Sequence, residues 1–213
     1  MSSLARKIQS EGPAPRTGPI DSRQLSKLFP SLFKMMDVNR RLTVLEIGPA
    51  LTETVDFFSQ FKCRLHFVDL FHEAFMSEQQ AGLSEKELRH AFEEQFRFPS
   101  DTRIDICLFW DFQCYLDDPA LRAFNSALRP WVHSGTKAHG FGVHHLAIHL
   151  DNIQYGVINK DTLSIRKRHS AQLPYYPHSQ IEMHEMLTCF DFERGLLLPE
   201  GKLEMLLKPR PDL

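Results

Sequence analysis

Residues 42–69 read LTVLEIGPALTETVDFFSQFKCRLHFVD, and this stretch decides the fold. Its first six residues form a β-compatible run that stops at Gly48-Pro49, which indicates a strand followed by a turn. Apolar residues then recur on one helical face, at Leu51, Val55 and Phe58. A second apolar run, Leu65 to Val68, ends on Asp69. Strand, turn, helix and strand in this order predict a βαβ unit with a right-handed crossover.

The sequence beyond this unit predicts more strands of the same sheet. The run from Ile104 to Trp110 is apolar except for Asp105, which is typical of a strand covered on both faces. Lys137 to Leu150 is expected to form a further strand. Hairpins are predicted at Tyr155 to Ile165 and at Leu196 to Leu207. The predicted fold class is therefore α/β: a Rossmann-like, mostly parallel sheet flanked by helices, with a C-terminal antiparallel hairpin.

Helix starts are marked by capping residues. Two S-x-x-E capping boxes, beginning at Ser84 and at Ser179, each predict a helix. Asp118 is expected to cap another helix, with a proline in its first turn. Near the N-terminus, apolar residues at helical spacing predict a helix from Asp21 onward, with a break at Pro30.

Length and composition favour one compact domain. The chain has 213 residues, 42% of them hydrophobic, and a formal net charge of -2. We expect a flexible leader at residues 1–20 and a single domain at residues 21–213. No apolar run approaches the ~20 residues of a membrane span, and the leader lacks the apolar core of a secretory signal. These features predict a cytoplasmic protein with no membrane partner. The near-neutral charge also makes nucleic acid an unlikely partner, and the absence of a CxxC pair predicts reduced core thiols.

Candidate site residues follow three of the predicted strands. In an open parallel sheet, ligands bind at the carboxyl ends of the strands, near the point where strand order reverses. The first strand ends in Glu46 and Gly48, the second in Asp69 and the central one in Asp111-Phe112. Gly48 permits close approach of the backbone to a ligand, and Asp69 has the reach to bind ribose hydroxyls. The spacing between Gly48 and Asp69 in the sequence suits an adenosine ligand. The structural alternative is that these residues only shape turns.

Four segments carry a family resemblance: VLEIGPA (44–50), LHFVDL (65–70), IDICLFWDFQCYLDDPALRAF (104–124) and LRPWVHSGTKAHGF (128–141). They resemble, in order, the successive motifs of class I S-adenosylmethionine-dependent methyltransferases. The closing hairpin is similar to the antiparallel sixth and seventh strands of that family. The resemblance implies S-adenosylmethionine as cofactor and methyl transfer to an unidentified acceptor. It also implies that Glu46 to Gly48 face the methionine part, that Asp69 holds the ribose, and that Asp111 and Phe112 line the pocket.

The chain departs from this family at the cofactor turn. The family has alternating glycines there, whereas this chain has Gly48 followed by Pro49 and Ala50, and Pro49 has no N–H to donate. The alternative function is therefore a catalytically inactive, methyltransferase-like module that acts as an interaction or regulatory protein. A nicotinamide dehydrogenase is a third candidate, which the closing hairpin disfavours. The oligomeric state stays open.

Two groups of basic residues complete the candidates. His144 and His145, near the pocket end of their predicted strand, are weak candidates for a general base, since an imidazole titrates near neutrality. No cysteine or carboxylate stands at a recognised ligand spacing from them, so no metal site is expected. The run from Arg166 to His169 is expected to be a solvated face rather than a nucleic-acid contact.

Overall fold

The computed structural model describes residues 19–34, 40–78, 82–145 and 147–211. The predicted leader, residues 1–20, lies outside these ranges except for its last two residues. The strands are β1 (Ser22–Leu25), β2 (Leu42–Ile47), β3 (Cys63–Val68), β4 (Ile104–Trp110), β5 (Val132–Gly142), β6 (Ile153–Val157), β7 (Thr162–Lys167), β8 (Phe190–Leu197) and β9 (Leu203–Pro209). The α-helices are α1 (Thr52–Phe58), α2 (Ala74–Glu78), α3 (Glu85–Gln95), α4 (Asp118–Leu128) and α5 (Gln180–Met186). Short 3-10 turns are η1 (Phe29–Phe33), η2 (Leu70–His72), η4 (Phe112–Tyr115) and η5 (Arg129–Trp131).

The larger sheet has six strands in the order β3-β2-β4-β5-β9-β8. The pairs β2/β3, β2/β4 and β4/β5 are parallel, and β9 pairs antiparallel with both β5 and β8. The βαβ unit, the internal position of β4 and the antiparallel closing hairpin are therefore confirmed. Because β3 lies on one side of β2 and β4 on the other, strand order reverses at β2. This is the point where an open α/β sheet binds ligands.

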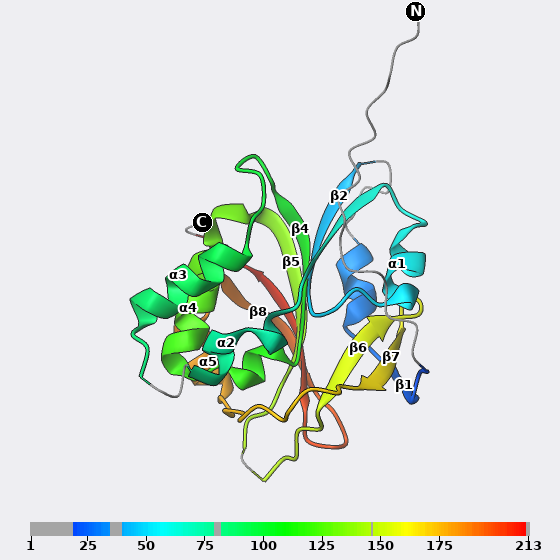
Figure 1. Ribbon diagram of the computed structural model, residues 1–213. Helices are drawn as coiled ribbons and strands as arrows, with labels where there is room; N and C mark the ends of the chain where they lie inside the picture. The colour runs from blue at the N-terminus through cyan, green and yellow to red at the C-terminus, as the bar shows by residue number, and fades with distance from the viewer. Residues whose placement is uncertain (1–18, 35–39, 79–81, 146, 212–213) are drawn as a thin grey trace, which may run out of the picture.

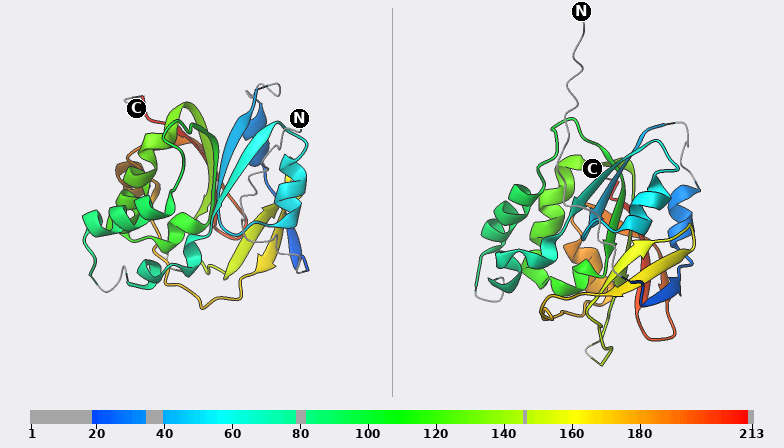
Figure 2. Two further views of the ribbon diagram at one scale, coloured as in Figure 1. Left: turned by 45° about the horizontal axis from the view of Figure 1, so that its top comes forward. Right: turned by 45° about the vertical axis from the view of Figure 1, so that its right-hand side comes forward.

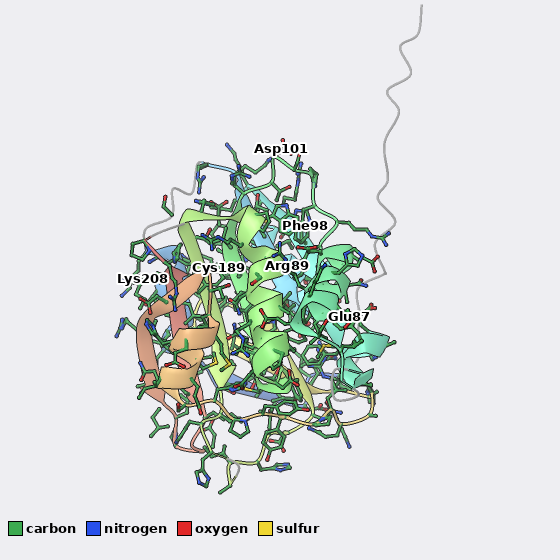
Figure 3. The ribbon with its side chains drawn as sticks, turned by 90° about the vertical axis from the view of Figure 1, so that its left-hand side faces the viewer. Glu87, Arg89, Phe98, Asp101, Cys189 and Lys208 are labelled. Carbon is green, nitrogen blue, oxygen red and sulfur yellow. The ribbon has the colours of Figure 1, made fainter. Side chains whose placement is uncertain are left out.

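Helices cover one face of this sheet and a mixed layer covers the other (Figure 1). The first face carries α3, α4 and α5, and Figure 3 looks onto it, with Glu87 and Arg89 on α3. The opposite face carries η1, α1 and a second sheet of three strands in the order β1-β7-β6. The second sheet lies beside α1 in both views of Figure 2. The central sheet is thus covered on both sides, as its buried strand β4 requires.

The predicted helix caps are confirmed, except for the cap of α4. Both capping boxes are present, at Ser84 and at Ser179, and each opens its helix. The cap of α4 is Asp117 instead of Asp118, because the Asp117 carboxylate accepts the hydrogen bond from the N–H of Ala120. Asp118 is the first residue of the helix itself.

The N-terminal segment differs from its prediction. A helix was expected from Asp21, but residues 22–25 form β1, which pairs antiparallel with β7. Pro30 then lies in the first turn of η1, where its missing N–H costs no helical hydrogen bond. Strand pairing across the fold has overridden the local helical spacing.

The predicted strand from Lys137 to Leu150 is displaced toward the N-terminus. β5 begins at Val132, which pairs with Ile104, and it ends at Gly142. Beyond that end, the carbonyl oxygen of Val143 accepts a hydrogen bond from the N–H of His178 (3.0 Å), so the chain no longer pairs with β9. The region containing the candidate histidines is therefore irregular.

Three of the four cysteines are core residues, as predicted, whereas Cys63 is only half-buried. Cys107, Cys114 and Cys189 are buried, and all the cysteines of the chain are free. Burial raises the thiol pKa of each of the three, to about 12 for Cys114 and Cys189. These thiols stay protonated and unreactive at neutral pH. Separately, no helix within the described ranges is long and apolar enough to cross a membrane.

Candidate functional site

The structure brings the predicted strand-end residues to one edge of the six-stranded sheet. β2 lies between β3 and β4, and Glu46 pairs in register with Phe67 of β3 and with Leu108 of β4. Asp69 follows β3 directly and Asp111 follows β4 directly. The three acidic side chains therefore start from neighbouring strand ends, at the point where strand order reverses.

Gly48 forms the turn between β2 and α1. Its φ of +149° lies in the region that side-chain-bearing residues rarely adopt. Its N–H donates to the carbonyl oxygen of Val68 (2.9 Å), and a Cβ added to it would meet no heavy atom within 4 Å. Although Gly48 is buried, there is open space beside its Cα atom. The close approach of a ligand at this turn stays a prediction.

Glu46 is a buried carboxyl group at this edge, with 1% of its surface exposed. Its Oε1 accepts a hydrogen bond from Nε1 of Trp110 (3.0 Å), whereas its Oε2 has no hydrogen-bond partner among the described residues. Burial raises the pKa of Glu46 to about 8, although the bond from Trp110 acts in the opposite direction. Glu46 is therefore mainly protonated at neutral pH and has a proton to donate.

Asp111 is the second buried carboxyl group at this edge of the sheet. Burial raises its pKa to about 6, and the charges of Arg168 and Lys202 limit the rise. Its neighbour Phe112 is also fully buried, with its ring centroid 5.2 Å from that of Phe71 and 5.3 Å from that of Phe124. Phe112 is thus packed into the core beside the site.

Asp69 lies at the end of the edge strand β3 and is partly exposed. Its Oδ2 is 3.8 Å from Nε2 of His72, one turn further along the chain. Its side chain makes no capping hydrogen bond to η2.

The basic run contradicts its prediction. It was expected to be solvated, but Arg166 and Arg168 are only 7% and 5% exposed, while Lys167 and His169 are exposed. The reason is the period of two along the end of β7, which turns alternate side chains inward. Arg166 pairs with Glu53 in the first turn of α1 through Nε–Oε1 (2.9 Å) and Nη2–Oε2 (2.8 Å).

Arg168 lies at the site itself. Its Cζ is 3.4 Å from the ring centroid of Phe71, two residues beyond Asp69, and its Nη2 donates to the carbonyl oxygen of Ile153 (2.7 Å). The block of four charges could have been recognised in sequence as two inward and two outward residues of a strand. Which elements the inward pair would meet was not readable from the sequence.

Aromatic rings of β4, β5 and β6 stack on one another at the same edge of the sheet. The Tyr155 ring stacks on Trp110 (centroids 5.6 Å apart) and on Phe141 (4.9 Å). Trp110 has a φ of +50°, which is unusual for a bulky residue and is associated with functional sites and packing constraints. The Tyr155 ring thus covers Trp110, the last residue of β4.

A small crevice opens at the carboxyl ends of β4 and β5. Its lining residues are Gln113, Cys114, Gly142, Val143, His144, Tyr176, His178, Gln180, Met183, Leu203 and Met205. Its free volume is about 10 Å³, which is room for one water molecule. In this arrangement the crevice holds no larger ligand.

The candidate histidines are divided by the structure. His144 is exposed and lines the crevice, whereas His145 is exposed and accepts a hydrogen bond from the N–H of Ala147 through Nδ1 (3.0 Å). Only His144 is thereby placed beside a cavity at this edge. Within the described ranges, no group of three His, Cys, Asp or Glu side chains could hold a metal ion.

A buried polar cluster that sequence reasoning missed lies deeper in the sheet. Glu204 of β9 accepts hydrogen bonds from Ser26 Oγ and from the N–H of Leu28 (3.0 Å), and its Oε1 is 3.0 Å from Nε2 of His139. Burial raises the Glu204 pKa, but these bonds outweigh it and hold the pKa at about 2. The cluster fastens the N-terminal segment to the sheet. Ser26 and Glu204 are 178 positions apart in the sequence, so no local signal reveals the cluster.

No family model and no curated protein matches the chain. Among solved structures, it is similar to the pyocyanin biosynthetic protein PhzM (12% identity, 85% of this chain and 54% of that chain, TM-score 0.44). It is also similar to the glycopeptide N-methyltransferase MtfA complexed with S-adenosyl-L-methionine (12% identity, 85% and 91%, TM-score 0.45). A third similar structure is the PH0226 protein from Pyrococcus horikoshii OT3 (13% identity, 86% and 88%, TM-score 0.46).

The chain spans about half the length of PhzM and most of the other two proteins. The chain itself has a mixed α/β architecture, with a central sheet flanked by helices and an antiparallel pair of strands at one end of that sheet.

Proposed function

We propose that the chain is an S-adenosylmethionine-dependent methyltransferase-like protein that binds its cofactor at the carboxyl ends of β3, β2 and β4. The observation that carries this proposal is the burial of two carboxyl groups, Glu46 and Asp111, where strand order reverses. Burying a carboxyl group costs free energy, and such groups with raised pKa values cluster at functional sites. Open α/β sheets bind their ligands at this same place.

The residues present fit an S-adenosyl ligand in three respects. The open space beside Gly48 leaves room for close approach of the methionine part to the backbone. The Oε2 of Glu46, which has no partner among the described residues, belongs to a carboxyl group that can donate a hydrogen bond to a ligand oxygen. The carboxylate of Asp69 can accept hydrogen bonds from the two ribose hydroxyls. Pro49 fits less well, because it removes one N–H from the turn.

When bound, S-adenosylmethionine supplies an electrophilic methyl group on a sulfonium centre. The task of the protein is then to orient an acceptor and exclude water, which can supply much of the rate without many catalytic side chains. His144, beside the crevice at the ends of β4 and β5, is the proposed general base for an acceptor that must lose a proton. The acceptor itself is not assigned.

A second candidate function is favoured by a specific observation. The stacking of Tyr155 on Trp110 and of Arg168 on Phe71 closes the proposed cofactor site with the protein's own side chains. Together with Pro49, this packing favours a methyltransferase-like module without turnover, acting as an interaction or regulatory protein. The two functions differ in whether the purified protein binds the cofactor.

We further propose that residues 21–213 act as one domain in the cytoplasm. The two hydrophobic clusters of the described residues lie on opposite faces of a single six-stranded sheet, which supports one folding unit. The free, buried thiols suit a reducing compartment.

Calorimetric titration of the full chain with S-adenosylmethionine and S-adenosylhomocysteine tests the proposal, with NADH as the control ligand. We expect both S-adenosyl compounds to bind and NADH to release no binding heat. A ligand that binds only the native state also raises its stability, by about 2.7 kcal/mol at 100 times its Kd, so the melting temperature should rise. Absence of binding at millimolar S-adenosyl ligand would favour the module without turnover.

A further inference from the structure

The hairpin formed by β6 and β7, together with Arg168, crosses the edge of the sheet where the cofactor is proposed to bind. We call residues 153–168 the strap. We propose that the strap is autoinhibitory: the Arg168 guanidinium occupies the place of the adenine ring and must leave before the cofactor can bind. This inference rests on the proposed function and names its regulation.

The surroundings of Arg168 are those that an adenine ring would require. Its Cζ lies 3.4 Å from the ring centroid of Phe71, and the edge of that ring packs against Phe112. Phe71 follows the proposed ribose ligand Asp69 by two residues, so a base attached to that ribose would reach the same ring. The Arg168 charge also acts on the buried carboxyl group of Asp111.

A guanidinium and an adenine ring share the properties that this place recognises. Both are flat and stack on aromatic rings, and both carry N–H groups that can donate to a carboxylate. When adenine replaces Arg168, the stack on Phe71 and the charge interaction with Asp111 are exchanged for a stack and an N–H group that can donate to the Asp111 carboxylate. The side chain of Arg168 thereby competes with the ligand for the same contacts.

The rest of the strap is fastened over the adjoining part of the site. Arg166 pairs with Glu53, and the N–H of Val157 donates to Oγ1 of Thr54 (3.0 Å). Glu53 and Thr54 lie in the first turn of α1, a few residues beyond Gly48. Tyr155 stacks on Trp110, whose indole N–H donates a hydrogen bond to Glu46. The strap therefore covers the parts of the edge assigned to both the adenosine and the methionine of the cofactor.

A closed strap lowers the measured affinity without altering the site beneath it. If only the open fraction of molecules binds, the measured Kd equals the intrinsic Kd divided by that fraction. Removing the Arg168 side chain enlarges the open fraction and so tightens binding. Removing an exposed neighbour from the strap leaves the fraction unchanged.

The test is a titration of three full-length proteins with S-adenosylhomocysteine: the parent, Arg168→Ala and Lys167→Ala. Lys167 is the matched control, because it is the preceding residue on the strap and its side chain is exposed. We expect Arg168→Ala to bind about tenfold more tightly than the parent, and Lys167→Ala to bind like the parent. Equal or weaker binding by a folded Arg168→Ala protein overturns the proposal.

Hydrogen exchange on the parent protein supplies a second readout that needs no substitution. With S-adenosylhomocysteine bound, amides of the strap such as Val157 should exchange faster, while those of β2 and β4 become better protected. A bound complex in which the strap amides exchange at the same rate or more slowly contradicts the inference. If neither the parent nor Arg168→Ala binds the ligand, the proposed function is wrong, and the proposed autoinhibition is wrong with it. If both proteins bind the ligand equally tightly, only the proposed autoinhibition is wrong.

Discussion

The indole Nε1 of Trp110 donates a hydrogen bond of 3.0 Å to Oε1 of Glu46, linking the last residue of β4 to the end of β2. These strands flank the place where the order of the parallel strands reverses. The bond holds a buried carboxyl group in place but satisfies only one of its two oxygens. A buried acid of this kind makes the stability of the fold depend on pH.

Glu46→Gln should make the protein more stable at alkaline pH than its parent. The folded-state pKa of Glu46, about 8, lies above the ordinary carboxyl value of 4.5. The native state thus binds more protons between these values, and stability falls as pH rises from about 4.5 to 8. Because one unit of pKa shift corresponds to ~1.4 kcal/mol, the advantage of the variant should reach about 2 kcal/mol or more by pH 8. Urea unfolding of both proteins from pH 5 to pH 9 measures it. Parallel curves would remove Glu46 as a buried, protonated acid.

Asp69→Asn should weaken binding of S-adenosylmethionine while leaving stability near the parent value. A carboxylate accepts charge-assisted hydrogen bonds from ribose hydroxyls that an amide cannot fully replace. The loss should be ~1.5–3 kcal/mol, roughly tenfold or more in affinity. Calorimetric titration and unfolding on one preparation separate binding from folding. Asp101→Asn, on an exposed loop before β4, is the control. Unchanged affinity in Asp69→Asn would take this residue out of the site.

Glu53 and Arg166 should show strong energetic coupling. Both side chains are largely buried, and two hydrogen bonds join them. Breaking a buried pair by removing one partner typically costs ~3–5 kcal/mol, because the other charge is left buried. We expect Glu53→Gln and Arg166→Gln each to destabilise the protein, and the double variant to lose less than the sum. A double-mutant cycle by urea unfolding measures this, and additive losses would show that the pair is not coupled.

Glu204→Gln should make the free energy of unfolding depend less on pH in acid solution. The Glu204 pKa of about 2 lies below the ordinary value of 4.5. Its contribution to stability is therefore present above about pH 4.5 and is lost as pH falls from there toward 2. Between pH 5 and pH 2, the parent should lose more stability than the variant. The comparison needs unfolding free energies at several acidic pH values, and equal losses in both proteins would contradict this account of the Ser26–Glu204–His139 cluster.

Sequence patterns within one segment predicted the elements whose formation depends on neighbouring residues. The unit β2-α1-β3 and the two hairpins follow from the spacing of apolar residues and from turn residues. The helix expected from Asp21 failed because β1 gains its partner from β7, more than a hundred residues away. A pattern read within one segment cannot contain that information.

The candidate site could be predicted only in part for the same reason. Sequence reasoning placed Glu46, Gly48, Asp69 and Asp111 at neighbouring strand ends, because parallel strands share an edge. It could not foresee that Arg168 and Tyr155 would lie over that edge, since their positions depend on how the strap packs against α1. The basic run was misread as a solvated block, although its alternate residues face inward.

An S-adenosyl ligand is proposed to bind at the carboxyl ends of β3, β2 and β4, and crystals grown with S-adenosylhomocysteine test this location. We predict electron density for the adenosyl group beside Asp69 and Phe71, with the Arg168 side chain displaced from the Phe71 ring. Density for the ligand at any other place, with Arg168 still on Phe71, would contradict the account.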